Sequence, residues 1–251
     1  MNFLPPHDWP VEGHFVHYPR CDSTNQLAQQ LIQDGQATPG TIVHTDYQTA
    51  GRGQQHNQWE SAEAQNLTFS IVLFPELPIE QQHYLTMAVS LSVHDVLTEL
   101  LSSPVAIKWP NDILCESSKI CGILIQNNLK GRKIHSCVVG IGLNVNQDEF
   151  ESAHATSLAL LTGHYWERAP LLTQLAQRIA SRFQQLERGH TTDLKRHYLE
   201  NMFWKDEQHL FEDSHGTFYG TILGIDPSGR LAVAVEDQVR YYGTKELVYK
   251  F

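Results

Sequence analysis

Long hydrophobic runs are missing from this 251-residue sequence. Its longest apolar segments, 67–74 and 138–145, have the length of strands, whereas a membrane-spanning helix needs about 20 apolar residues. The first nine residues contain no basic cluster and no extended apolar stretch, so they lack the pattern of a secretory signal peptide. We therefore expect a soluble cytoplasmic protein that does not enter a membrane.

Cysteines and basic residues are scarce. The four cysteines form no CxxC pair, which predicts free thiols, and the 14 histidines show no Cys/His spacing of a zinc site. Lysine and arginine number 18 against 28 aspartates and glutamates, a formal charge of −10. Proteins that bind nucleic-acid backbones normally carry a basic surplus. We therefore expect no binding to duplex DNA, although a local basic pocket for a small phosphate ligand is compatible with this charge.

Several nucleotide-binding and hydrolase motifs are also absent. The sequence has no GxxxxGK[ST] phosphate loop, no HExxH zinc motif and no GxSxG nucleophile motif. The segment Gly51-Arg52-Gly53 lacks the third glycine of a dinucleotide-binding fingerprint and lies in a polar stretch. If the chain is an enzyme, we expect its nucleophile to come from a substrate.

Hydrophobic residues make up 41% of the chain and charged residues 18%, which allows a packed core. Apolar spacing predicts amphipathic helices over 85–100, 172–186 and 193–201. Apolar runs predict strands over 41–47, 67–74, 105–109, 113–115, 120–125 and 134–145. Because the strands between 105 and 145 follow at hairpin spacing, we expect an α+β fold with a mixed or antiparallel sheet backed by helices.

The last part of the chain has a different pattern. After about residue 205, short strands are expected over 216–225, 231–235, 239–242 and 247–251, separated by turns such as 227–229. This spacing is typical of a small β-barrel of about 45 residues. We therefore predict two domains, 1–205 and 206–251.

Two segments near the amino-terminal end combine residues that suit ligand binding. Segment 21–25 reads CDSTN, and its ordinary interpretation is a helix start in which Ser23 and Gln26 form a capping box. Segment 46–53 reads DYQTAGRG and begins a long polar loop, 48–64. Glycines on both sides of Arg52 expose backbone N–H groups beside a guanidinium, which suits an anion, although a solvated surface loop is the ordinary alternative.

A third segment places lysines among apolar residues. Lys108 interrupts the run 105–109 and is followed by Pro-Asn-Asp, and Lys119 opens the run 120–125. Each lysine alone is compatible with a surface position at a strand edge. In 139–146, glycine and asparagine alternate with apolar residues, so one face of that strand is small enough for a ligand to lie against the backbone.

In this order and at these separations, the segments CDSTNQLA, DYQTAGRG with a following tryptophan, IKWPNDIL, KICGIL and GIGLNVN resemble the motifs of the biotin–protein ligases. The resemblance is strong over 14–147 and loose after that. It implies a class II synthetase-like ligase core with a small carboxy-terminal SH3-like β-barrel. It also implies that ATP activates biotin to biotinyl-5′-adenylate, and that biotin is then transferred to a lysine of a biotin carboxyl carrier protein, such as that of acetyl-CoA carboxylase.

The resemblance assigns roles to individual residues. The residues implied for biotin are mostly neutral and include two cations: Ser23, Thr24, Asn25, Gln48, Gly51, Arg52, Gly53, Gln54, Lys119 and Gly122. The residues implied for ATP or the adenylate are Arg52, Trp59, Lys108, Asn111, Lys119 and Asn144. Lys119 and Arg52 are the implied catalytic cations, so replacing either by alanine should reduce adenylate formation by orders of magnitude. Mg²⁺ accompanies ATP without a fixed protein site, and Asp112 is a metal contact, an indirect support or a turn cap.

The sequence departs from the family pattern in the loop after Gly53. Many relatives carry basic residues and a glycine there, whereas 54–58 reads QQHNQ and leaves Arg52 as the only arginine or lysine between residues 48 and 64. We expect weaker ordering of this loop around a phosphate. The ligase pattern also begins within about 20 residues of Met1, from which we expect no DNA-binding winged helix and no repressor activity.

Two alternatives stay open, as does the oligomeric state. A lipoate–protein ligase would share the chemistry and the core fold, although the motifs fit the biotin branch better. A non-catalytic biotin-binding module is supported only by the altered loop. Relatives pair through the edges of their sheets, so a homodimer is possible for this chain.

Overall fold

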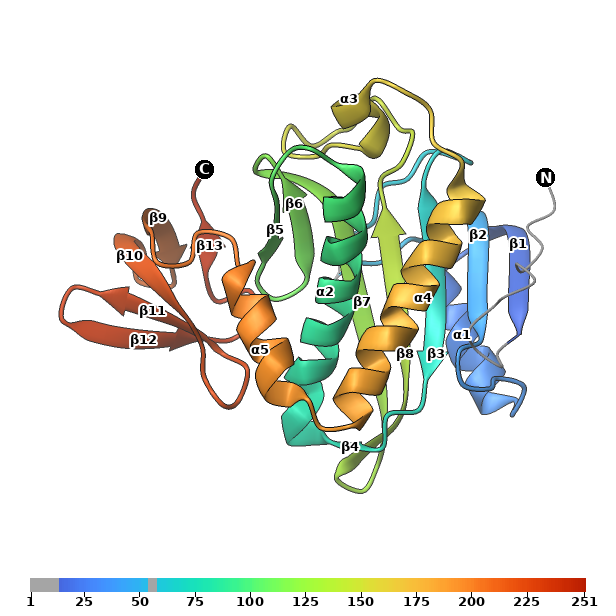
Figure 1. The fold of residues 1–251 in the computed structure, drawn as a ribbon, viewed down its shortest axis with the longest axis horizontal. Coiled ribbons are helices and arrows are strands. Elements are labelled where there is room, and N and C mark those ends of the chain that lie inside the picture. Colours follow the sequence, from blue (N-terminus) through green and yellow to red (C-terminus); the bar gives the residue numbers. More distant parts are fainter. Residues whose placement is uncertain (1–13, 54–57) are drawn as a thin grey trace.

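The computed structural model describes residues 14–53 and 58–251, which are built around one mixed sheet of eight strands (Figure 1). The strand order is β1-β2-β3-β8-β7-β6-β5, and β4 pairs with β8. The strands are β1 (Phe15–Cys21), β2 (Ile42–Gln48), β3 (Leu67–Leu73), β4 (Leu77–Pro78), β5 (Val105–Lys108), β6 (Asp112–Cys115), β7 (Ser118–Lys130) and β8 (Lys133–Leu143). Among the described strands of this sheet, only β1 and β2 pair in parallel. The prediction of a mixed sheet backed by helices is confirmed.

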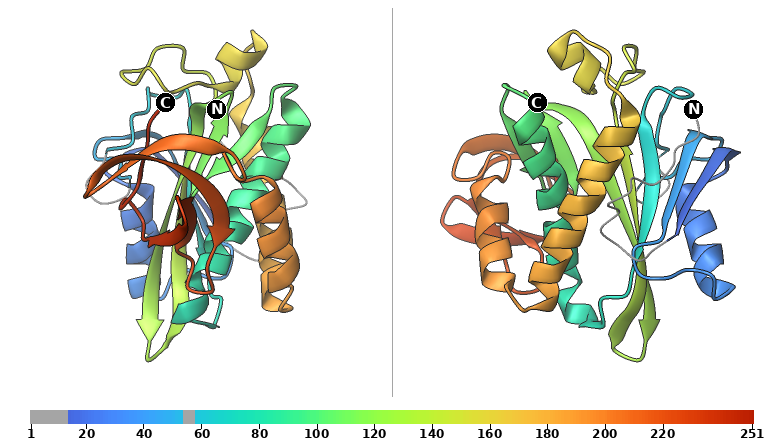
Figure 2. Two further views of the ribbon diagram at one scale, coloured as in Figure 1. Left: turned by 90° about the vertical axis from the view of Figure 1, so that its left-hand side faces the viewer. Right: turned by 45° about the vertical axis from the view of Figure 1, so that its right-hand side comes forward.

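Helices cover both faces of this sheet. The helices are α1 (Thr24–Gln33), α2 (Gln82–Leu100), α3 (Leu158–Thr162), α4 (Arg168–Glu187) and α5 (Thr191–Glu200), with a 3₁₀ turn at Ile79–Gln81. Helices α2, α4 and α5 gather on one face, whereas α1 lies on the other (Figure 2). The apolar residues divide in the same way, because Val43, Val72 and Val138 form a small separate cluster with Ala28 of α1. None of the described helices is long and apolar enough to cross a membrane.

Strand β1 is not predicted by the sequence. Its residues are mixed in polarity, and Pro19 cannot donate a backbone hydrogen bond. The strand forms at the edge of the sheet, where one side needs no partner and proline is tolerated. Its register with β2 runs from Phe15 opposite Ile42 to Cys21 opposite Gln48, so the segment after β1 starts beside the end of β2.

The carboxy-terminal part forms a second, antiparallel sheet. Its strands are β9 (Gln208–Asp213), β10 (Gly216–Ile225), β11 (Leu231–Val235), β12 (Gln238–Tyr242) and β13 (Val248–Tyr249). The described pairings follow the open path β12-β11-β10-β9-β13, so the antiparallel sheet is present without a closed barrel among them. The division into domains 1–205 and 206–251 stays a prediction.

The two sheets meet through the turn between β10 and β11. The Trp109 indole N–H donates to the carbonyl oxygen of Gly229 at 3.3 Å. A Cβ on Gly229 would lie 2.7 Å from the Cβ of His83, and Gly229 has a φ of +88°. Only glycine fits this close approach between the turn and α2 without strain. The second sheet is thereby held beside the edge of the first sheet that ends in β5 (Figure 1).

Candidate active site

A cleft of about 600 Å³, here called the main cleft, brings together most residues that the resemblance assigns to ligands. It is lined by the amino-terminal end of α1, the end of β2 with its following loop, the β5–β6 turn, β7, β8 and strand β13. The assigned residues that line it are Ser23, Thr24, Asn25, Gln48, Arg52, Gly53, Trp59, Lys108, Asn111, Asp112, Lys119 and Gly122. Of the others, Gly51 and Asn144 line neighbouring cavities, and Gln54 lies outside the described residues.

Neutral polar side chains form a network at the α1 end of the main cleft. The Gln48 side-chain oxygen accepts hydrogen bonds from the backbone N–H of Thr24 at 2.8 Å and from its hydroxyl at 3.2 Å. Ser70 lies within 2.8 Å of the Thr24 hydroxyl and 2.6 Å of the Asn25 side-chain oxygen. Asn25 in turn donates to the Gln126 side chain at 3.0 Å. These groups are neutral donors and acceptors, which suits a neutral ring with N–H and carbonyl groups.

The beginning of α1 differs from the predicted capping box. Ser23 occupies the N-cap position with extended backbone angles, but its side chain makes no capping hydrogen bond. The prediction that Ser23 and Gln26 close a capping box is therefore wrong. Ser23 is only 3% exposed and lines the main cleft, so its hydroxyl is placed where a ligand can contact it.

Glycines form the floor of the main cleft. A Cβ on Gly140 would lie 2.2 Å from the Asn25 side-chain oxygen, and a Cβ on Gly142 would lie 2.2 Å from the Trp59 ring. A Cβ on Gly122 would lie 3.0 Å from the same ring. The indole N–H of Trp59 is buried without a hydrogen-bond partner among the described residues. The small face predicted for 139–146 is confirmed, and Trp59 lies directly on it.

Replacing Gly140 should therefore weaken binding at the neutral end of the main cleft. In Gly140→Ala the new methyl group would displace the Asn25 amide, and losing such hydrogen bonds costs about 1–3 kcal/mol. We expect the Kd of biotin, the ligand that the resemblance assigns to this end, to rise about 10- to 100-fold when it is measured by calorimetry. Because the methyl acts through Asn25, the double variant Gly140→Ala/Asn25→Ala should bind as Asn25→Ala does, and additive losses would contradict this explanation.

Two lysines and one carboxylate also line the main cleft. The Lys119 ammonium is 2.7 Å from the Asp112 carboxylate, and both side chains are about one-third exposed. The backbone of Lys119 is fixed by hydrogen bonds with His154 at 2.7 Å and Thr156 at 3.0 Å. Lys108 is half-buried, and burial lowers the pKa of its ammonium group, opposed by the charge of Asp112 and assisted by that of Lys119. The strands β5, β6 and β7 thus place two lysines around one carboxylate.

Arg52 reaches the main cleft from the loop after β2. Its side chain is exposed, and its backbone forms an isolated antiparallel bridge with Gln58. Gly51 lies so close to the start of the next segment that a Cβ there would be 2.8 Å from the Trp59 carbonyl oxygen. The two described ends of this loop therefore lie side by side, and Arg52 and Lys119 line one cavity.

Asn144 lies in a neighbouring cavity of about 570 Å³, here called the Asn144 cavity, which shares Trp59, Lys108, Asp112 and Lys119 with the main cleft. The Asn144 side-chain N–H donates to the carbonyl of Thr156 at 2.9 Å. Its side-chain oxygen is buried and has no partner in the part of the chain described. A buried acceptor without a partner needs a ligand or water to satisfy it.

Asn111 has a partner inside the protein. Its side-chain N–H donates to the carbonyl oxygen of Ile123, and the residue is only 6% exposed. This bond ties the β5–β6 turn to β7. Asn111 lines the main cleft, which agrees with its predicted place on the nucleotide side. Its side-chain N–H, however, already donates to Ile123 and holds the turn.

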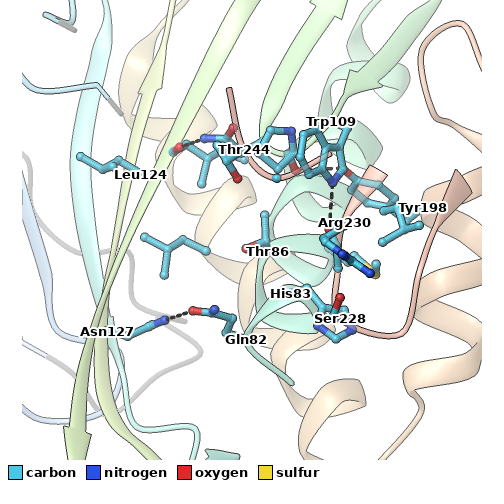
Figure 3. A pocket seen from close by; sticks show the side chains of 18 residues that line it. Gln82, His83, Thr86, Trp109, Leu124, Asn127, Tyr198, Ser228, Arg230 and Thr244 are labelled. Carbon is cyan, nitrogen blue, oxygen red and sulfur yellow. Dashed lines mark hydrogen bonds between the residues drawn. The ribbon is translucent and has the colours of Figure 1, made fainter. Parts of the chain in front are cut away.

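A third cavity of about 480 Å³ adjoins the main cleft around the same turn (Figure 3). It shares Trp109, Pro110, Asn111, Ile123, Leu124 and Thr244 with the main cleft. Figure 3 shows Trp109 and Tyr198 at one end and the Gln82–Asn127 hydrogen bond of 3.2 Å at the other. The Tyr198 hydroxyl donates to the Pro110 carbonyl at 2.8 Å. The turn that borders the main cleft is thus supported from α5 and from the second sheet.

The described residues contain no group of three or more His, Cys, Asp or Glu side chains that could hold a metal ion. Among the described residues, Asp112 is the one carboxylate that lines the main cleft, and it is paired with Lys119. Mg²⁺ in nucleotide sites is commonly bound by one or two carboxylates together with substrate phosphates. The residues present therefore fit an ion that arrives with a nucleotide and takes at most one ligand from Asp112.

The family model described as the biotin/lipoate A/B protein ligase family matches residues 18–144. This stretch is half of the chain and includes α1, the Arg52 loop, both lysines and the glycine face. The chain belongs to this family. Its site residues therefore lie within the part of the chain that defines the family, except for those of the carboxy-terminal sheet.

Individual ligases of the family are similar over most of the chain. The bifunctional ligase/repressor BirA of Bacillus subtilis is 30% identical over 233 residues, covering 90% of this chain and 71% of the relative. The biotin–[acetyl-CoA-carboxylase] ligase of Paracoccus denitrificans is 28% identical over 221 residues, covering 84% of this chain and 90% of the relative. The biotin protein ligase of Aquifex aeolicus, solved with biotin and ATP, has a TM-score of 0.77 and 27% identity, covering 94% of this chain and 99% of that structure.

Some residues of the site are not among those assigned from the sequence. Ser70 and Gln126 belong to the polar network around Asn25, and Gly140 and Gly142 form the floor. A serine inside the apolar run 67–74 is a signal that could have identified Ser70. Tyr249 lines both the main cleft and the Asn144 cavity. No sequence pattern indicates that this strand of the second sheet reaches the site.

Proposed function

We propose that this chain is an ATP-dependent biotin–protein ligase. It activates biotin to biotinyl-5′-adenylate and transfers the biotinyl group to a lysine of a biotin carboxyl carrier protein. The observation that carries the proposal is the order of groups along connected cavities. A neutral hydrogen-bonding network lies at the α1 end of the main cleft, Arg52 and Lys119 line the same cleft, and Lys119 also lines the adjoining Asn144 cavity.

Each part of this order matches one part of a biotinyl adenylate. The ureido ring of biotin is neutral, so Thr24, Asn25 and Gln48 are suitable partners for it. The biotin carboxylate and the α-phosphate are anionic, and Arg52 and Lys119 supply positive charge for them. Adenine has both donors and acceptors, and the buried Asn144 oxygen, which has no partner among the described residues, is available to accept a hydrogen bond from it. Trp59, at the boundary of both cavities, can stack on the base.

The proposed reaction has two steps. First, an oxygen of the biotin carboxylate attacks the α-phosphate of ATP, and the bond from that phosphorus to pyrophosphate breaks. Second, the uncharged amine of the carrier lysine attacks the acyl carbon, AMP leaves, and the nitrogen loses a proton. Lys119 and Arg52 reduce the repulsion between the carboxylate and the phosphates, and the cleft aligns the reacting atoms. Mg²⁺ neutralises the phosphate charge when it arrives with ATP.

Partner and location follow from the same chemistry. The carrier lysine must come from another protein, which we propose to be the carrier domain of a carboxylase. Because the reaction consumes ATP, we place the enzyme in the cytoplasm.

The edge of β7 suggests how two copies of the chain pair. β7 pairs with β6 only over its first residues, Ser118–Gly122, so among the described strands the rest of its edge is open. We propose a homodimer that forms by pairing of these edges, and light scattering across a concentration series tests it, since a monomer throughout would exclude it.

Biotin-dependent exchange of labelled pyrophosphate into ATP tests the enzymatic proposal. We expect exchange with biotin and little with lipoate, followed by transfer of biotin to a carrier domain detected by mass spectrometry. Exchange that prefers lipoate would assign the chain to the lipoate branch of the family. Tight biotin binding by calorimetry without any exchange would instead show a non-catalytic binding module.

A further inference from the structure

Lys108 is held by aromatic rings of the carboxy-terminal sheet. It is the last residue of β5, and its ammonium nitrogen lies 4.7 Å from the ring centroid of Tyr249 and 5.0 Å from that of Phe251. Asp112 is opposite Lys108 in the β5–β6 register, but the Asp112 carboxylate forms its ion pair with Lys119. Within the described residues, Lys108 is therefore in no ion pair: it feels the charge of Asp112, but its close contacts are the faces of these two rings.

The two rings are fixed by further aromatic contacts. Phe203 stacks on Phe251 at 6.0 Å between centroids, and Trp204 stacks on Tyr249 at 5.6 Å. Phe251 also stacks on His154, with 5.3 Å between the ring centroids. The segment that carries Phe203 is itself bound to β5, because the Phe203 N–H donates to the Ile107 carbonyl at 3.0 Å. The lysine and the rings around it thus belong to one connected unit.

The position of Lys108 gives this unit a function. Lys108 and Tyr249 both line the main cleft and the Asn144 cavity. In the proposed function, the phosphates of ATP lie between the acyl group in the main cleft and the base in the Asn144 cavity, next to these two residues. The Tyr249 hydroxyl is also buried without a partner in the described part of the chain, and the residue is only 8% exposed. A wall with an aromatic-bound ammonium group and an unsatisfied hydroxyl is suited to a polar, anionic ligand.

We propose that Tyr249 and Phe251 are positioning residues for Lys108, so that the carboxy-terminal sheet supports the adenylation step by aiming one cation at the ATP phosphates. This inference rests on the proposed function. A ring face attracts an ammonium group without carrying a full negative charge. The lysine is therefore restrained in direction, yet it keeps most of its attraction for phosphate.

Substitutions at Phe251 test this role by the KM for ATP. Phe251→Leu keeps an apolar side chain but removes the ring, and Phe251→Trp keeps a ring with a stronger face. We expect Phe251→Leu to raise the KM for ATP about fivefold, the size of a partly exposed cation–π contact, with the Kd for biotin unchanged. Phe251→Trp should retain the wild-type KM. Phenylalanines with one, two and three fluorines at position 251 should raise the KM in steps, because fluorine withdraws charge from the ring face.

Two comparisons separate positioning from a general loss of structure. In a Lys108→Met background the effect of Phe251→Leu should disappear, because no ammonium group remains to be aimed. Tyr219→Leu removes an aromatic side chain that is 65% exposed on the same sheet and should leave the KM unchanged. An unchanged or lower KM in Phe251→Leu, or an equal effect with Lys108→Met, would overturn the inference. If the wild-type chain shows no exchange with biotin, the proposed function fails instead.

Discussion

Lys119→Ala is expected to reduce biotin-dependent pyrophosphate exchange by about 10²- to 10³-fold, the usual loss when one preorganised charge or donor at the reacting group is removed. Lys119 is held at the start of β7 by backbone hydrogen bonds with His154 and Thr156, and its ammonium group lies 2.7 Å from Asp112. Its charge is therefore in place before the anions arrive. Because the lysine acts on developing charge, the rate of adenylate formation should fall more than the affinity for biotin. Stopped-flow kinetics measures the rate, and calorimetry measures the affinity.

Lys130→Ala is the matched control for this variant. Lys130 is at the other end of the same strand and is exposed, so its loss changes the net charge equally without changing the main cleft. We expect full exchange activity from this control. An equal loss in both variants would show that only the overall charge matters, and full activity of Lys119→Ala would remove Lys119 from the reaction.

Arg52→Ala should also reduce adenylate formation strongly, by about 10²-fold, but with a different signature. Arg52 is exposed on a loop that lines the main cleft, so its guanidinium is free to bind the carboxylate and phosphate once they are present. We therefore expect the adenylate to dissociate faster. Release of radiolabelled adenylate from the purified complex measures this rate, with Arg188→Ala, an exposed arginine at the end of α4, as the control.

Arg52 is the only lysine or arginine in the polar loop 48–64, so a lysine at this position tests whether charge alone is sufficient there. If Arg52 alone supplies fixed positive charge in this loop, Arg52→Lys should recover only part of the activity, because lysine lacks the planar fork of donors. Complete recovery by lysine would show that charge without bidentate geometry is sufficient. Retention of the adenylate at the wild-type rate in Arg52→Ala would exclude Arg52 from phosphate binding.

Local patterns in the sequence predict the elements that carry the site. The alternation of glycines with apolar residues in 139–146 predicts the ligand-facing side of β8, and the structure places Asn25 and Trp59 on it. Hairpin spacing predicts that β5, β6 and β7 are neighbours, and this brings Lys108 and Lys119 to one carboxylate. The glycine alternation and the hairpin spacing are both visible within short stretches of the chain, so short-range patterns are sufficient to predict these strands, although Asn25 and Trp59 reach β8 from distant segments.

Contacts between distant segments are what the sequence does not predict. The pairing of Ser70 with Asn25 spans 45 residues, and the contact of Lys108 with Tyr249 joins two different sheets. Neither partner has a periodicity or motif that indicates the other. Strand β1 is missed for a related reason, because its stability comes from its place beside β2 and not from its own mixed composition. Tertiary packing decides these features.

The structure of this chain bound to a non-hydrolysable biotinyl-adenylate analogue tests the central claim most directly. We expect the ureido ring to contact Thr24, Asn25 and Gln48, the linkage between acyl and phosphate groups to lie within hydrogen-bond reach of both Arg52 and Lys119, and the base to enter the Asn144 cavity. An analogue bound elsewhere, or bound in the main cleft with its linkage out of reach of both cations, would contradict the account.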